Sequence, residues 1–193
     1  MPKDVFQGST VSRRRSKAMR SLADSFAAGL DRLDLPRPLP TPVLLEELIR
    51  LAADRRGRPV ILRKEIFPPH TASGLWMELA THDVIAVDRR AADWHQVLIV
   101  GHEIWHMLED DCGAHDGDQA MAARLFADDS ELEPAIAKLA TRTNFREQAE
   151  RDAEKFGLQL VTSLNPWLAQ TANEAPASDI AKRIGASLGL PAR

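Results

Sequence analysis

The chain has 193 residues, 44% of them hydrophobic and 27% charged, so it can bury the core of one domain. Its net charge of -3 excludes a general attraction to nucleic acid or anionic membranes, and we expect no direct nucleic-acid binding. The single cysteine excludes an internal disulfide, and no apolar run reaches the roughly 18 residues of a membrane span. We therefore expect a cytoplasmic protein.

The N-terminal part is predicted to be helical. Residues 1–11 are polar without periodicity, which predicts a disordered tail. From residue 12 to 33, apolar side chains recur every three or four positions, as in an amphipathic helix. A proline-rich linker follows, and Thr41 is then expected to cap a second helix that ends near Gly57. The two N-terminal helices thus occupy residues 12–57.

Three short segments rich in β-branched and aromatic residues predict a small sheet over residues 59–88. The segments are residues 59–63, 74–79 and 83–87. A turn around residues 81–83 joins the last two, so the sheet is predicted to be antiparallel. We expect about three strands.

The next predicted helix, residues 91–111, contains the string His-Glu-Ile-Trp-His at 102–106. Histidines four positions apart lie on one helical face, so His102 and His106 can converge on one metal ion. Glu103 follows about 100° around the helix and can reach a metal-bound water. This is the H-E-x-x-H pattern of zinc peptidases, in which the glutamate is a general base. The same residues would also suit a helix with ordinary buried or ion-paired histidines.

The C-terminal part is expected to supply the remaining zinc ligand. Residues 118–142 predict two short helices, residues 144–164 a longer one, and residues 171–193 a tail with one weak helix. This order predicts an α+β, mostly helical, minimal zincin-like fold, with one metallopeptidase domain at residues 12–170. The sheet edge would hold an extended peptide beside the metal.

A catalytic zinc takes three protein ligands and keeps one position for water. The candidates for the third ligand are His115, Glu147, Glu150, Asp152 and Glu154. On a helical wheel Asp152 and Glu150 flank the apolar face at roughly 70° and 90° from its centre, whereas Glu147 and Glu154 point away. This geometry leaves both Asp152 and Glu150 open.

The motif helix, followed about forty residues later by Glu-Arg-Asp-Ala-Glu-Lys-Phe at 150–156, resembles the ImmA/IrrE family of bacterial metallopeptidases, particularly its actinobacterial members. The segments at 56–60 and 73–76 are also similar, so the resemblance spans roughly residues 20 to 165. In that family the glutamate directly before the alanine of the second helix is a zinc ligand. The resemblance therefore implies that Asp152, before Ala153, completes the site with His102 and His106.

Two residues depart from the family pattern. Asp152 is one methylene shorter than the family's glutamate, so its helix would have to approach about 1 Å closer to the zinc. Trp105 stands where many relatives carry glycine, and we expect it to pack in the core. The chain also lacks tyrosine. A second donor to the oxyanion would have to be an arginine or one of three histidines, His82, His95 and His115.

The resemblance implies a zinc endopeptidase, a gluzincin-like hydrolase that cleaves or inactivates a helix-turn-helix transcriptional repressor. The catalytic base would be Glu103 and the cofactor Zn2+. Two alternatives of other classes remain. One is a zinc-stabilised binding module that grips such a partner without hydrolysis, and the other is the toxin component of a toxin-antitoxin pair.

Overall fold

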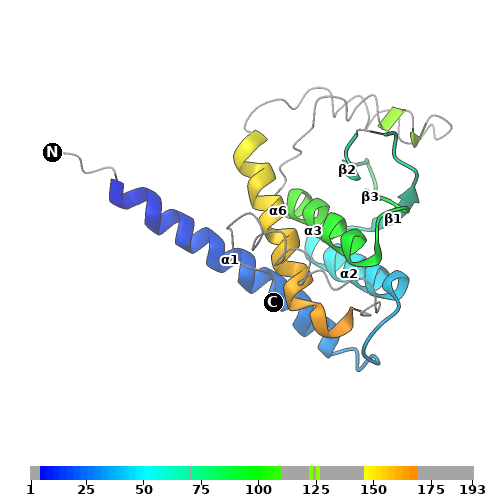
Figure 1. Ribbon diagram of the computed structural model, residues 1–193, viewed down its shortest axis with the longest axis horizontal. Coiled ribbons are helices and arrows are strands. Elements are labelled where there is room, and N and C mark those ends of the chain that lie inside the picture. Colours follow the sequence, from blue (N-terminus) through cyan, green and yellow to red (C-terminus); the bar gives the residue numbers. More distant parts are fainter. Residues whose placement is uncertain (1–4, 70, 110–121, 124, 127–145, 169–193) are drawn as a thin grey trace, which may run out of the picture.

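The computed structural model describes residues 5–69, 71–109, 122–123, 125–126 and 146–168, and Figure 1 shows their arrangement. The described residues form an α+β, mostly helical fold, which confirms the predicted class. None of the described helices combines the length and the apolar character needed to cross a membrane. In chain order the elements are α1 (Val5–Asp31), α2 (Thr41–Arg56), β1 (Val60–Glu65), β2 (Gly74–Glu78), β3 (Asp83–Asp88), α3 (Asp93–Glu109), α6 (Arg146–Ser163) and the 3-10 turn η1 (Asn165–Trp167).

The three strands form a mixed sheet in the order β1-β3-β2, which corrects the expectation of an antiparallel sheet. β2 and β3 are antiparallel, with Trp76 opposite Ile85, and the Leu79 N–H donates to the His82 carbonyl 2.9 Å away in their tight turn. β1 pairs with the other side of β3 in parallel, with Leu62 opposite Ile85. A hairpin turn fixes only the pairing of its own two strands, so it leaves the direction of β1 open.

Side chains of the central strand β3 alternate between two clusters of the core, and all six of its residues are buried. Ile85 and Val87 pack with the helices, whereas Val84 and Ala86 face a second cluster on the opposite face of the sheet. That second cluster includes Phe67 from the β1–β2 connection, together with Leu75, Met77, Leu79, Ala122 and Phe126. The sheet is therefore covered on both faces.

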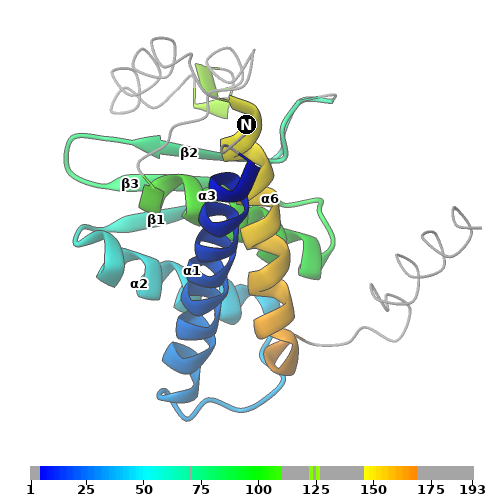
Figure 2. The same ribbon diagram turned by 90° about the vertical axis from the view of Figure 1, so that its left-hand side faces the viewer.

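α3 lies at the centre of the fold, between the sheet and α6. Its apolar residues Val97, Val100 and Ile104 are fully buried, which explains why its sequence is apolar around most of its circumference. Figure 2 shows α1 and α6 side by side, and two hydrogen bonds join them: Lys155 Nζ to Ser16 Oγ at 2.6 Å, and Ser163 Oγ to Asp24 Oδ1 at 2.9 Å.

Where the structure describes the ends of α2, α3 and α6, the predicted helices agree with it to within about two residues. The N-terminal helix differs. α1 already begins at Val5, so the prediction of a disordered tail is wrong for residues 5–11. α2 ends before Gly57, whose left-handed φ of 74° stops the helix, but Pro40 rather than Thr41 is its N-cap. The helices predicted within 118–142 and 179–188, and the predicted helix end at residues 112–113, fall outside the described elements.

Candidate metal centre

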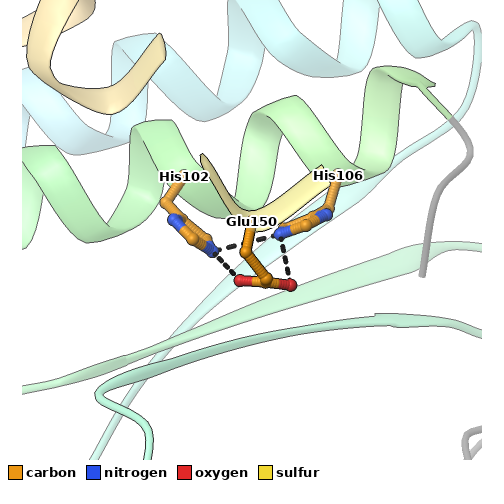
Figure 3. Close-up of side chains that lie close together, drawn as sticks. All are labelled: His102, His106 and Glu150. Carbon is orange, nitrogen blue, oxygen red and sulfur yellow. Dashed lines mark hydrogen bonds and ion pairs between the residues drawn. The ribbon is translucent and has the colours of Figure 1, made fainter. Parts of the chain in front are cut away.

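His102 and His106 are brought together by the middle and last turns of α3, as their spacing predicts. Their rings lie with centroids 4.7 Å apart, and their Nε2 atoms are 3.0 Å apart. The His106 side chain is almost fully buried, with 5% exposed, and that of His102 is 16% exposed. The Nε2 atoms of both rings therefore point toward one shared position (Figure 3).

The third side chain at this point is Glu150, from the second turn of α6. Its Oε2 lies 3.3 Å from His102 Nε2, and its Oε1 lies 3.4 Å from His106 Nε2. The possible ligand atoms of the three residues all lie within 4.8 Å of one another. Two ligand atoms of a tetrahedral zinc, each about 2.1 Å from the ion, are about 3.4 Å apart, so the separations between the nitrogens and oxygens of this cluster are of the size that neighbouring zinc ligands have.

Asp152, the ligand implied by the family resemblance, is not brought to the histidines; Glu150 lies at that point instead. Residues two apart on a helix point about 200° away from each other, so Glu150 faces α3 while Asp152 faces α1. Asp152 Oδ2 lies 2.8 Å from Arg15 Nε of α1. This ion pair accounts for a carboxylate that is only 9% exposed.

A close contact between two glycines brings α6 against α3 next to the histidines. A Cβ added at Gly157 would lie 2.8 Å from the Leu98 carbonyl oxygen and 3.5 Å from the His102 nitrogen. A Cβ added at Gly101 would lie 3.2 Å from Gly157 Cα. Glycine in a helix interior is unfavourable by about 1 kcal/mol relative to alanine, which is the sequence signal that could have revealed this packing role.

Trp105 packs between the same two helices. Its ring lies 5.1 Å from that of Phe156, and the residue is 4% exposed, so it is a core residue, as expected. Together with the glycine contact, this aromatic pair fixes α6 against α3 on the side where Glu150 must reach the histidines.

Among the side chains that the structure describes, the other candidates do not join the cluster. Glu154 is exposed on α6, and the side chain of Glu147 as well as all of His115 lie outside the described residues. His82 lies in the β2–β3 turn, where its Nδ1 is 3.0 Å from Thr81 Oγ1. His95 stacks on Trp94 two turns before His102, about 10 Å along the helix axis, too far to touch a group bound between the motif histidines.

The donor set of two imidazole nitrogens and one carboxylate fits zinc. It is the set found in one class of catalytic zinc sites, in which a fourth position stays open for water. Glu103 follows His102 on α3 and is only 8% exposed, so its side chain is held inside the protein. The described cluster therefore offers three possible ligands, and a buried acid follows the first of them in the sequence.

Comparison with known proteins found no matching family model, no matching curated protein and no matching solved structure.

Proposed function

We propose that this protein is a zinc-dependent metalloendopeptidase. The observation that carries the proposal is the convergence of His102, His106 and Glu150, from two helices distant in sequence, on one point. Two imidazole nitrogens and a carboxylate at these distances would form a three-ligand set that leaves one position open. Glu103, which is buried and follows His102 in the sequence, would supply the remaining group that peptide hydrolysis needs.

In this mechanism a zinc ion would acidify a water molecule and polarise the peptide carbonyl. Glu103 would accept the proton from the attacking water and pass it to the departing amine. Burial of Glu103 excludes bulk water from this proton transfer. The resemblance to the ImmA/IrrE family supports a helix-turn-helix repressor as the protein substrate.

The second candidate is a zinc-stabilised binding module without hydrolytic activity. It is favoured by the absence of tyrosine and by the positions of His82 and His95, because neither histidine belongs to the described cluster. An oxyanion without a second donor would be stabilised less well in the transition state. The two candidates share the metal site and differ only in turnover.

Replacement of Glu103 by glutamine separates these two functions. We expect the variant to keep its zinc content and thermal stability but to cleave labelled casein more slowly, by on the order of a hundredfold or more. The matched control is Glu109→Gln, which changes an exposed acid of the same helix. A zinc-loaded wild-type protein that leaves casein and a co-purified repressor intact would support the binding module instead.

A further inference from the structure

Gly74, the first residue of β2, lies directly against α3. A Cβ added at this position would overlap the Cγ2 methyl of Ile99 and would lie 2.6 Å from Oε1 of Glu103. It would also lie 3.2 Å from Glu103 Cγ. The side chain of the proposed general base therefore occupies the space that any other residue at position 74 would need.

The backbone conformation of Gly74 does not itself require glycine. Among the described residues Gly57 is the glycine with positive φ, and Gly74 pairs regularly with Val87 of β3. An alanine could adopt this strand geometry without backbone strain. What glycine provides at position 74 is space for two side chains of α3.

These contacts place the Glu103 carboxylate between α3 and the start of an edge strand. Glu103 has two side-chain torsions before its carboxylate, and its direction is set by what surrounds it. Ile99, one turn earlier on α3, fills the neighbouring space against the same glycine. A methyl group at position 74 would have to displace the carboxylate, the isoleucine or the strand.

We propose that Gly74 is a positioning residue for Glu103: the missing side chain at the start of β2 lets the carboxylate lie where it can exchange a proton beside the His102–His106–Glu150 cluster. The catalytic meaning of this inference rests on the proposed peptidase function, whereas the contact itself does not. The expected consequence of filling the space is loss of turnover without loss of metal.

The first test is a double-mutant cycle on thermal unfolding that needs neither zinc nor activity. The cycle compares the wild type with Gly74→Ala, Glu103→Ala and the double variant. The Glu103→Ala change removes Oε1 and Cγ, the two Glu103 atoms that lie near position 74. We expect Gly74→Ala to lower the Tm less in the Glu103→Ala background than in the wild type. Equal Tm losses in the two backgrounds would show that residue 74 does not press on Glu103 and would overturn the proposal.

The second test measures zinc content and casein cleavage in Gly74→Ala and in Gly74→Ala/Ile99→Ala, which relieves the overlap with Ile99. Both variants should keep zinc and a similar KM, and both should have kcat lower by on the order of a hundredfold, the scale of a 1 Å misplacement. Recovery of kcat in the double variant, or zinc loss in either, would overturn the proposal.

The control is Gly29→Ala, since the three atoms nearest to a Cβ there belong to the side chain of Leu51, far from the cluster in sequence. If the wild-type protein neither holds zinc nor cleaves casein, the proposed function fails. In that case the unfolding cycle still decides whether Gly74 positions Glu103.

Discussion

At the scale of single residues, two acids of α6 have different roles because the helix turns each toward a different neighbour. Glu150 meets the histidines of α3, and Asp152 meets Arg15 of α1. A buried carboxylate needs a polar or charged partner, and each of these acids has one. Only two positions in the sequence therefore separate a possible metal ligand from a structural ion pair.

This difference predicts that two matched substitutions change different properties of the protein. Glu150→Gln removes an anionic oxygen from the cluster. We expect zinc affinity to fall by more than the roughly 10- to 100-fold loss that follows when a residue hydrogen-bonded to a zinc ligand is replaced. Asp152→Asn weakens the pairing with Arg15 and should lower thermal stability while leaving one zinc per chain. Metal analysis after dialysis and calorimetry would measure the two effects.

Three further variants complete this test. His102→Ala and His106→Ala should each lose zinc as Glu150→Gln does, and exposed Glu154→Gln should behave like the wild type. Zinc loss from Asp152→Asn with retention in Glu150→Gln would contradict the geometry and restore the assignment implied by the family resemblance.

The spacing of His102, Glu103 and His106 was enough to predict their shared place on one helix, because helical periodicity is a local property. The choice between Glu150 and Asp152 was not predictable in this way. Both flank the apolar face of α6, and which flank meets α3 depends on where α1 packs. That information comes from contacts between residues more than 130 positions apart.

At the scale of elements, the distance between α3 and α6 is set where Gly157 meets the backbone of α3. The atom nearest to an added Cβ at Gly157 is a backbone carbonyl oxygen, which cannot move aside as the end of a side chain can. Glu150 lies two turns earlier on the same helix, so a displacement of α6 at Gly157 is transmitted to the carboxylate.

We therefore expect Gly157→Ala to weaken zinc binding although it changes no ligand. The added methyl group forces α6 away from Leu98 and should also lower the Tm, despite the higher helix propensity of alanine. Gly29→Ala is the matched control, because its nearest neighbours are movable side-chain atoms of Leu51. Competition with a chromogenic chelator would measure the affinity, and equal affinities in the two variants would contradict this role of the glycine contact.

The elements themselves were largely predictable from local pattern, as the positions of α2, α3 and the three strands show. The direction of β1 was not, because eight residues separate β1 from β2 and no tight turn joins them. β1 instead pairs in parallel with β3, and α2, the helix before it in the sequence, packs against it.

At the scale of the whole molecule, Asp88 connects the end of the sheet to the start of the helical layer. It accepts hydrogen bonds from the Arg90 backbone at 2.9 Å and from the Arg90 guanidinium, which also donates to the Phe67 carbonyl at 2.6 Å. The side-chain hydrogen bond from Arg90 is the main cause that lowers the pKa of Asp88 below its usual 3.8.

This lowered pKa predicts an acid-dependent part of the stability. Because the folded pKa is below the unfolded value, the stabilisation by charged Asp88 is complete above the unfolded pKa and is lost as the pH falls through the folded one. Asp88→Asn should therefore be less stable than the wild type at pH 7, and the difference in unfolding free energy should shrink below about pH 4. Urea titrations across this range would measure it, and a difference independent of pH would exclude this origin.

The long α1–α6 contact also has a consequence for the order in which the protein can assemble. The hydrogen bonds between these helices join residues 139 positions apart, so they form only when nearly the whole described chain is present. Contacts over such separations form slowly, because a large loop must close first. His102 and His106 can be helical before this happens, but their third partner arrives only with α6. A chain still emerging from the ribosome thus has the motif without the complete cluster, so metal binding by all three side chains would have to wait until folding is finished.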